Sequence, residues 1–402
     1  MVIHAQLGAR MHYAVPRILW RTGMLERLYT DLVADKGWPR LVTALAPPRW
    51  IDGLPARLAA RVPALLPPGK VVHWPGFALE YFWRQRRAKS RSEMTDAHLW
   101  AGREFCRRII RHGLNGASSV YTFNSAGLEL LEHARQQGLF CVMEQTIAPV
   151  EVQEELLAGE QRAFPGWEPL GGADPRTAEF AARERAEWDC AHLIVCGSEF
   201  VRQGIAKCGG PAERCVVVPY GVDSVAPRSL KSERGRPLKV LIAGTVGLRK
   251  GAQYVLEAAR ELGGAAELRW CGGVALLPAA ASQVSAHVEL CGAIPSSQIR
   301  EHYAWADVFL LASICEGSAT VCYEALAAGL PVVTTPNAGS VIRDGIDGFI
   351  VPIRDGPAIA GRLRLLAGDR ERLSWMSANA TARSREFTVE KYGDRLVGAI
   401  GR

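Results

Sequence analysis

The sequence lacks several patterns that would restrict its function immediately. It has no run of about 18 consecutive apolar residues, the length that a membrane-spanning helix needs. Its opening residues, VIHAQ, have neither the basic region nor the long apolar stretch of a secretory signal. Its ten cysteines include no C-x-x-C pair, and several lie in apolar runs. We therefore expect a cytoplasmic protein that is neither exported nor embedded in a membrane.

Motifs for metals and for common phosphate loops are absent as well. No group of potential ligands has the close spacing in sequence of a metal site. The Walker A pattern and the G-x-G-x-x-G spacing of dinucleotide sites are also missing. Cys315 adjoins Glu316, but no histidine lies near it in sequence. We therefore interpret Cys315 as a packing or loop residue rather than a nucleophile.

Positive charge is concentrated near the start of the chain. The net charge is +7, yet residues 1–120 contain 19 Lys and Arg against 8 Asp and Glu. The excess is largest in residues 56–91, where aromatic residues precede the basic residues Arg84, Arg86, Arg87, Lys89 and Arg91. Such a segment can dock on an anionic membrane leaflet, hold a polyanionic acceptor or bind nucleic acid. An ordinary solvated helix face is an equally good interpretation.

The second half of the chain alternates buried strands with helical stretches. Its near-continuous apolar runs are PLKVLIAG, ELRWCGG, HVELCGA, DVFLLAS, PVVTT and GFIVP, all from residue 237 onward. Strands of this kind are typical of a doubly wound parallel sheet. The first half has a looser version of the pattern, interrupted by an insertion at about 36–115. We predict domains at 1–222 and 223–384, a linker at 221–237, and a C-terminal helix at 385–402.

Residues 242–255 form the first candidate binding loop, IAGTVGLRKGAQYV. Gly244 and Gly247 allow a tight turn after a strand, and Arg249 and Lys250 bring cations to the edge of the sheet. Ligands of open α/β sheets bind at this edge, so the loop can neutralise a diphosphate. Taken alone, the pattern fits an exposed basic turn better.

Residues 316–329, EGSATVCYEALAAG, form the second candidate loop. Ser318 is the expected N-cap of a helix that Gly329 terminates, which places Glu316 in the loop and Glu324 in the helix. Their spacing corresponds to about 12 Å in a helix, comparable to the distance from a ribose to a sugar joined through a diphosphate. The amides of Gly317, Ser318 and Ala319 would face phosphate oxygens. The alternative is a loop acid and a solvent-facing helix acid.

These residues resemble the E-x7-E segment of retaining glycosyltransferases with the GT-B fold, specifically glycosyltransferase family 4. The resemblance covers about residues 190–355 and includes HLIVCGSEFVRQGIAKCGGPAERCVVVPYGVD, GTVGLRKG and EALAAGLPVVTTPNAGSVIRDGIDGFIVP. It implies two Rossmann-like domains facing a cleft, with the C-terminal helix packing back on the N-terminal domain. It also implies sugar transfer from a nucleotide sugar to an acceptor hydroxyl with retention.

The resemblance assigns roles by motif position. Lys250 is expected to contact the donor diphosphate, Glu316 the donor sugar and Glu324 the ribose, and Lys250 and Glu316 are the predicted catalytic residues. The acceptor would be a glycan, a lipid-linked molecule or a small molecule, in polysaccharide, glycolipid or other glycoconjugate biosynthesis. The resemblance implies no metal and no other cofactor besides the nucleotide-sugar substrate, and no nucleic acid is expected. Attachment to the inner face of the membrane through residues 56–91 stays open.

The chain departs from the family pattern at several positions. Thr245 replaces the usual Arg of the phosphate loop, so Arg249 is the candidate for the second cation, and Ser318-Ala319 replaces Phe-Gly. On the acceptor side the candidates are Gly8, Arg10, His12 and Glu144, the last where many members have a His, with Gln145 as the alternative at that position. These departures leave two alternatives open, a non-catalytic GT-B protein that binds a sugar nucleotide or a polyanion, and a GT-B nucleotide-sugar epimerase.

Overall fold

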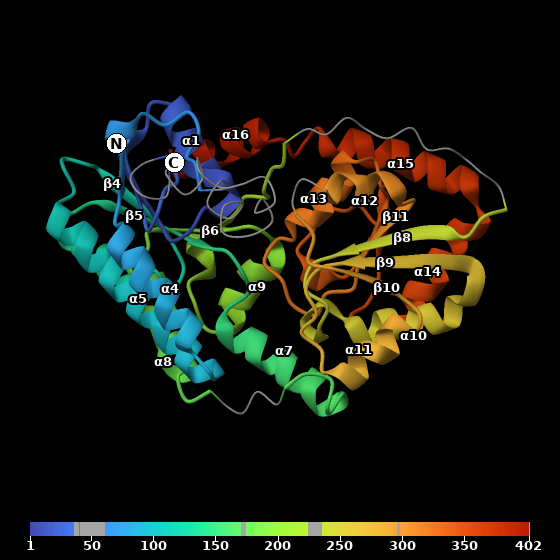
Figure 1. Cartoon of the computed structure of the whole chain (residues 1–402). Coiled ribbons are helices and arrows are strands. Elements are labelled where there is room, and N and C mark those ends of the chain that lie inside the picture. The colour runs from blue at the N-terminus through green and yellow to red at the C-terminus, as the bar shows by residue number, and fades with distance from the viewer. Residues whose placement is uncertain (36–39, 41–60, 170–173, 224–234, 296–297, 402) are drawn as a thin grey trace.

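The computed structural model describes residues 1–35, 40, 61–169, 174–223, 235–295 and 298–401. These residues form two α/β domains, each built around its own parallel sheet (Figure 1). The two Rossmann-like domains predicted from the sequence are therefore present. None of the described helices combines the length and the apolar character that crossing a bilayer requires.

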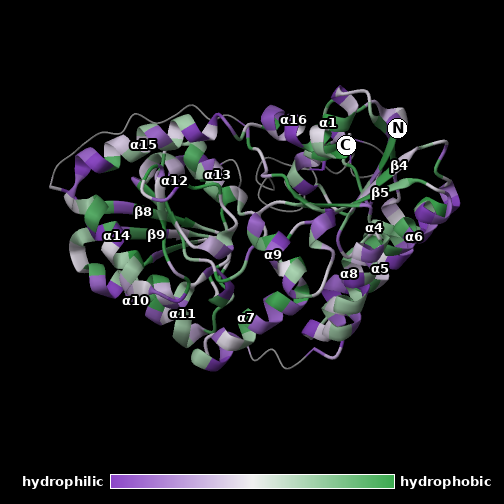
Figure 2. Cartoon of the chain, turned by 180° about the vertical axis from the view of Figure 1, so that it is seen from behind, coloured by the Kyte–Doolittle hydropathy of each residue, from purple (hydrophilic) through white to green (hydrophobic). Residues whose placement is uncertain are grey.

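The N-terminal sheet has seven parallel strands in the order β3-β2-β1-β4-β5-β6-β7. They are β1 (Val2–Gln6), β2 (Leu25–Thr30), β3 (Val71–His73), β4 (Ser119–Phe123), β5 (Phe140–Gln145), β6 (Leu193–Cys196) and β7 (Cys215–Val217). Strands β1 and β4 are buried along their whole length, because helices cover both faces of the sheet. Figure 2 shows green, hydrophobic stretches in the strands near the label β5.

Helices form two layers around this sheet. They are α1 (Ala14–Arg21), α4 (Pro75–Arg87), α5 (Arg91–His112), α6 (Leu128–Gln136), α7 (Val150–Ala163), α8 (Thr177–Cys190) and α9 (Glu199–Lys207). Phe105 of α5, Leu130 of α6 and Trp188 of α8 pack in one core with the inner faces of β1, β4 and β5. The opposite face of the sheet packs against α1, with Ile18 and Leu19 in the core.

The predicted insertion at 36–115 belongs in part to the domain itself. Residues 36–39 and 41–60 lie outside the described residues, but β3 pairs with β2 as an edge strand of the sheet, and α5 contributes to its core. The prediction of a separate insertion is wrong for this part of the chain. The sequence signal was weak because β3 has only three residues and β2, LERLYT, carries charges at partly exposed positions.

The C-terminal sheet has six parallel strands in the order β10-β9-β8-β11-β12-β13. They are β8 (Leu238–Ala243), β9 (Ala266–Cys271), β10 (Glu289–Gly292), β11 (Val308–Leu311), β12 (Val332–Thr334) and β13 (Gly348–Ile350). Each lies within one of the six predicted apolar runs or extends it by a residue. The helices are α10 (Ala252–Leu262), α11 (Pro278–Ser285), α12 (Ile299–Trp305), α13 (Thr320–Ala327), α14 (Gly356–Gly368), α15 (Arg370–Ser384) and α16 (Val389–Ile400).

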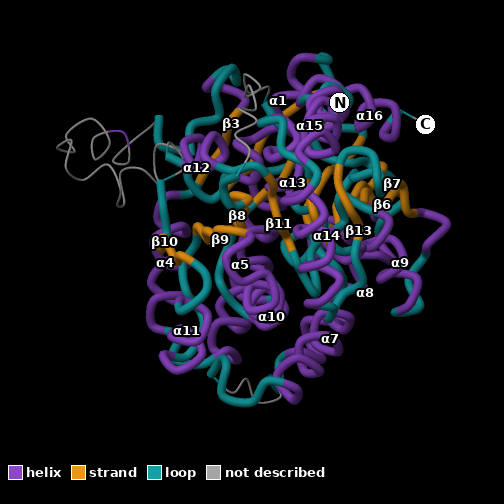
Figure 3. The backbone as a smooth tube through the Cα atoms, turned by 90° about the vertical axis from the view of Figure 1, so that its right-hand side faces the viewer, coloured by secondary structure: helices purple, strands orange, loops and turns teal. Residues whose placement is uncertain are grey.

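Short 3-10 helices complete the described secondary structure. They are η1 (Arg10–Tyr13), η3 (Pro68–Lys70), η4 (Ala212–Arg214), η5 (Leu248–Lys250), η6 (Gly263–Ala265) and η7 (Pro336–Ala338). Strands occupy the centre of the molecule and helices surround them (Figure 3). Of these turns, η1 and η5 follow the first strand of each sheet, where ligands of this fold class bind.

The chain returns to the N-terminal domain at its end. Thr388 forms a bridge with Val222, and α16 lies beside α1 (Figure 1). Tyr392 and Leu396 of α16 pack in the same core as Ile18 of α1. The C-terminal helix therefore covers one face of the N-terminal sheet. Most of the predicted linker, residues 224–234, lies outside the described residues.

Candidate functional site

The strand order determines where a binding crevice can form. In both sheets the order reverses beside the first strand, between β1 and β4 and between β8 and β11. Loops that leave two such strands turn in opposite directions and open a crevice at the carboxyl ends. The loops after β8 and β11 are the two stretches singled out in the sequence.

The loop after β8 places Lys250 over the end of the strand. Gly244 has φ +118, and a Cβ atom there would meet the Cε of Lys250 at 3.0 Å. Gly251, at φ +76, leaves no room for a side chain because its Cβ would lie 2.1 Å from the carbonyl oxygen of Ala312. The backbone N–H of Ile314 donates to the carbonyl of Arg249 at 2.9 Å. These contacts fix the loop against the end of β11.

Glu316 brings three charged side chains together. Its Oε1 lies 2.7 Å from Nζ of Lys250 and 2.9 Å from Nη1 of Arg249, and it accepts a hydrogen bond from Ser313 Oγ at 3.2 Å. Lys250 and Glu316 are both buried. Two cations face one carboxylate, so the cluster retains a net positive charge. A buried cluster of this sign is suited to an anionic ligand such as a diphosphate.

Contacts from the N-terminal domain hold the loop around Glu316. A Cβ atom on Gly317 would lie 1.9 Å from the carbonyl oxygen of Thr146. Ser198 Oγ donates to the carbonyl of Gly317 at 2.5 Å, and the N–H of Ala148 donates to the carbonyl of Glu316 at 3.4 Å. Only glycine permits this close approach, so Gly317 joins the two domains at the site.

Two expectations about the start of α13 are wrong. Ala319, not Ser318, is the N-cap residue, and it has no side-chain capping bond. The hydroxyl of Ser318 instead bonds with the carbonyl of Gly339 at 3.0 Å and with the hydroxyl of Tyr323 at 2.7 Å. The amide of Ala319 donates to the carbonyl of Ala338 at 3.0 Å, so it does not face a ligand. Both differences arise because the segment after β12 packs against this loop.

A cavity of about 730 Å³ lies between the domains. Its wall includes Met11, His12 and Arg17 from the N-terminal domain and Gly244, Thr245, Tyr303, Thr320 and Glu324 from the C-terminal domain. Glu324 Oε2 accepts a hydrogen bond from the hydroxyl of Tyr303 at 2.9 Å. Lys250 and Glu316 are not among the lining residues. They adjoin the cavity through Gly244, against which the Lys250 side chain packs.

The N-terminal wall of the cavity has an unusual backbone. Met11, His12 and Tyr13 have φ values of +46, +49 and +59, a run of left-handed residues without a glycine. Each such residue costs about 1–2 kcal/mol, and strain of this kind is common where a fold presents side chains to a ligand. Gly8 donates its N–H to Asp31 Oδ1 at 3.0 Å, and Arg10 lies over the ring of Phe123. Of the four acceptor-side candidates, His12 lines the cavity.

Glu144 lies away from the cavity. Its side chain has no exposed surface, and it accepts hydrogen bonds from the hydroxyls of Tyr121 and, at 2.8 Å, Tyr220. Burial raises its pKa above the usual range. We therefore assign Glu144 a structural role in the core. Cys315 is also buried, which raises the pKa of its thiol to about 12 and fits its interpretation as a packing residue.

Sequence reasoning missed Tyr303 and Arg17. Tyr303 lies on α12 and donates its hydroxyl to Glu324 of α13, and Arg17 lies on α1 in the other domain. Neither residue stands in a recognisable motif. Only the packing of helices around the cavity brings them to the site.

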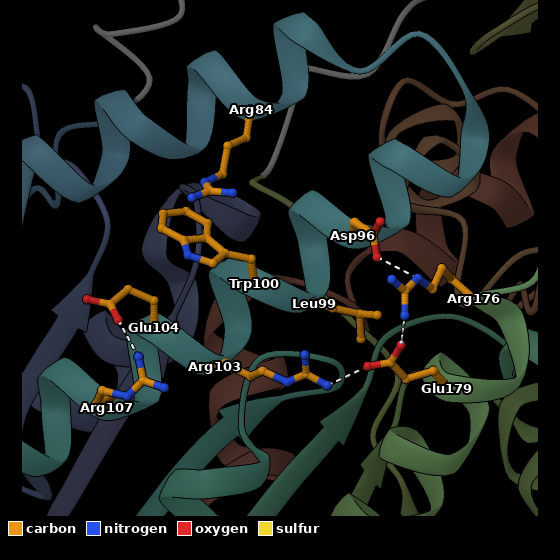
Figure 4. A pocket seen from close by; sticks show the side chains of 9 residues that line it. All are labelled: Arg84, Asp96, Leu99, Trp100, Arg103, Glu104, Arg107, Arg176 and Glu179. Atoms are coloured by element: carbon orange, nitrogen blue, oxygen red, sulfur yellow. Dashed lines mark hydrogen bonds and ion pairs between the residues drawn. The ribbon is translucent and has the colours of Figure 1, made fainter.

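A second, charged pocket lies between α4, α5 and α8 (Figure 4). Its arginines are paired: Arg103 with Glu179 at 2.5 Å, Arg107 with Glu104 at 2.9 Å, and Arg176 with Asp96 at 2.8 Å. Arg84 pairs with Glu80 and lies over the ring of Trp100 at 4.0 Å. Because acids neutralise these cations, the interdomain cavity is the better candidate for an anionic ligand.

Comparison with known proteins gives a family match within the C-terminal domain. Residues 237–369 match the family model described as glycosyl transferases group 1. The match contains Lys250, Glu316 and Glu324, and it covers the six-stranded sheet. Combined with the two-domain architecture, it supports a GT-B glycosyltransferase.

Two relatives and one solved structure extend the comparison. The D-inositol 3-phosphate glycosyltransferase of Xylanimonas cellulosilytica is 30% identical over 220 residues, which are 48% of this chain and 53% of that protein. The amylovoran biosynthesis glycosyltransferase AmsK of Erwinia amylovora is 30% identical over 197 residues, 44% of this chain and 48% of its own length. The chain thus spans about half the length of the relatives it matches.

The crystal structure of HepE from Anabaena in complex with UDP and glucose has a TM-score of 0.64 with this chain at 14% identity. The comparison covers 100% of this chain and 99% of HepE. At this identity the likeness shows the fold alone, and it confirms the predicted GT-B fold class.

Proposed function

We propose that the chain is a retaining glycosyltransferase that moves a sugar from a nucleotide-sugar donor to an acceptor hydroxyl. The observation that carries this proposal is the Lys250–Glu316–Arg249 cluster at the carboxyl ends of β8 and β11, beside a cavity whose wall includes Glu324. One relative is named as a D-inositol 3-phosphate glycosyltransferase and another as an amylovoran biosynthesis glycosyltransferase, and we propose a glycan, lipid-linked or small-molecule acceptor. A cytoplasmic location is part of the proposal.

The proposed roles follow from charge and position. Lys250 and Arg249 bind the donor diphosphate and stabilise the negative charge that develops on it as the glycosidic bond breaks. The uncapped first turn of α13, with Thr320 at the cavity wall, adds backbone amides to this anion site. Glu324 accepts hydrogen bonds from the ribose hydroxyls, and Glu316 orients the donor sugar. The acceptor hydroxyl attacks from the same face, and its proton passes to a leaving-group oxygen.

The experiment begins with thermal shift of the purified chain against UDP-, GDP- and ADP-sugars. The stabilising donor is then incubated with and without candidate acceptor glycans, and the products are analysed by NMR. A glycoside with the anomeric configuration of the donor supports the proposal, and inversion contradicts its retaining part. A changed sugar formed without acceptor indicates an epimerase, and binding without turnover indicates a non-catalytic protein.

We also propose that α4 docks the protein on an anionic membrane. Leu79, Phe82 and Trp83 are each 44–47% exposed and share one side of the helix with Arg86. Arg86 and Lys89 form no ion pair with another described residue. Exposed aromatic side chains beside unpaired cations match a leaflet of anionic lipids, where each basic residue contributes about 1 kcal/mol.

Vesicle sedimentation tests this docking. Binding to phosphatidylcholine vesicles that contain phosphatidylserine, and its loss at high salt, is the expected result. The variant Phe82→Ser/Trp83→Ser should release the protein, whereas Trp375→Ser, which changes a 52% exposed tryptophan on α15, should not. Equal binding to vesicles without phosphatidylserine, or no binding at low salt, would contradict the proposal.

A further inference from the structure

Two cysteines and a histidine meet at one edge of the C-terminal sheet. Cys271 ends β9, Cys291 lies in β10, and His302 lies in α12. Their ligand atoms all lie within 4.8 Å of one another. Strands β9 and β10 are paired, with Gly292 opposite Cys271, so the two thiols come from adjacent strands. The three residues are far apart in sequence, which is why no metal-ligand spacing is visible there.

His302 supplies a second, independent observation. Its Nδ1 is buried and has no hydrogen-bond partner among the described residues. An unsatisfied buried polar atom costs about 1–3 kcal/mol. Around the cluster, Cys291 Sγ lies 3.9 Å from Glu289 Oε1, and Glu289 is itself paired with Arg269 at 2.9 Å. The partly buried imidazole is therefore held next to two thiols, and its buried Nδ1 makes no hydrogen bond to another described residue.

We propose that Cys271, Cys291 and His302 bind a zinc ion. Two thiolates and an imidazole are borderline-soft ligands, a set typical of tetrahedral zinc and poorly suited to magnesium or calcium. On binding, each thiol releases its proton to solvent and its sulfur becomes a ligand. Three protein ligands leave the fourth position to water or to another oxygen donor.

The position of the cluster gives this zinc a structural consequence. Cys271 lines the interdomain cavity, and Ile299 and Tyr303 of the helix that carries His302 line it too. A bound ion would join β9, β10 and α12 and so fix one wall of the cavity. The ligands are distinct from Lys250 and Glu316, so the proposal does not depend on the proposed reaction.

Metal binding by the full-length, reduced protein tests the proposal. The chelator-treated protein is titrated with zinc against a chromophoric chelator, and with cobalt(II), whose thiolate charge-transfer absorption reports sulfur ligation directly. We expect one zinc per chain and a cobalt–thiolate band. Cys291→Ser and His302→Ala should each weaken zinc binding about 10- to 100-fold, and Cys291→Ser should reduce the cobalt band.

Cys208→Ser is the matched control, because Cys208 is likewise partly buried but belongs to no such cluster among the described residues. It should keep both the zinc affinity and the cobalt band. Circular dichroism of each variant separates loss of the site from loss of the fold. Zinc binding as strong in Cys291→Ser and His302→Ala as in the wild type would overturn the proposal. So would the absence of a cobalt–thiolate band, or a Cys271–Cys291 disulfide in place of metal binding.

Discussion

At the scale of single residues, Glu316 faces both cations of the proposed diphosphate site. Glu316→Gln keeps the size of the side chain but removes its charge, which frees Lys250 and Arg249 for phosphate. We expect turnover to fall about 100-fold because the donor sugar is misplaced, while nucleotide affinity is unchanged or slightly higher. Lys250→Met should instead weaken nucleotide binding. Calorimetry with the nucleotide and steady-state kinetics measure the two effects, and equal losses of both in Glu316→Gln would refute its assigned role.

His4 is a buried histidine in the centre of β1. Its Nε2 lies 2.8 Å from Gln6 Oε1, and burial lowers its pKa from 6.5 to about 4. The folded state therefore resists protonation, so the stability contributed by neutral His4 is present above pH 6.5 and is lost as the pH falls through about 4. The loss approaches about 3 kcal/mol.

Urea denaturation of the wild type and of His4→Leu at pH 7 and pH 4 measures this contribution. The variant cannot take up the proton. The free energy of unfolding of the wild type, relative to that of His4→Leu, should therefore be about 3 kcal/mol lower at pH 4 than at pH 7. His287→Leu, which changes an exposed histidine, should follow the pH dependence of the wild type. A constant difference between wild type and His4→Leu at both pH values would contradict the prediction.

The candidate residues were predictable to different degrees. Lys250, Glu316 and Glu324 were identified because they stand at the motif positions that carry the family resemblance, whereas the local pattern alone favoured an exposed basic turn and ordinary acids. The partners of Ser318 and Ala319 were not, because both bond to the segment at 338–339, which only the paired strands β11 and β12 bring near. Glu144 was selected at a strand end, but a strand-end side chain can point into the core as well as into a cleft.

At the scale of elements, Gly251 determines how α10 begins against β11. In Gly251→Ala the new Cβ would lie 2.1 Å from the Ala312 carbonyl oxygen. The alanine would also have to adopt the φ of +76 that the glycine has. The left-handed backbone costs about 1–2 kcal/mol and the overpacking about 1–3 kcal/mol more. Gly138→Ala is the matched control, because Gly138 has φ +74 and open space around it. Denaturation curves should therefore separate the two variants, and equal destabilisation would show that the contact with β11 is unimportant.

Strands were predictable from sequence where both faces are buried. The inner strands β8, β9, β11 and β12 of the C-terminal sheet lie in, or within a residue of, near-continuous apolar runs, and β1 and β4 of the N-terminal sheet are buried along their whole length. Edge position alone does not decide this, because the edge strands β10 and β13 lie in predicted runs as well. Strand β3 has only three residues, and β2, LERLYT, carries charges at partly exposed positions. This explains why β3 was read as part of an insertion and why β2, which lies between it and β1, was not recognised.

At the scale of the whole molecule, Glu160 connects the two domains. It lies on α7 in the N-terminal half and accepts hydrogen bonds from Gln253 Nε2 at 2.6 Å, the Tyr254 hydroxyl at 2.9 Å and Arg354 Nε at 2.6 Å. Only 1% of its surface is exposed.

Glu160→Gln removes the charge that these three donors surround, so the free energy of unfolding should fall by about 3 kcal/mol. Glu155→Gln on the same helix breaks a solvent-exposed pair with Lys207 and should cost less than about 1 kcal/mol. Denaturation measures both variants, and small-angle scattering should show a more open domain arrangement only for Glu160→Gln. Equal stability of the two variants would mean that the domains are held together mainly by the glycine contacts at Gly317 and the return of α16.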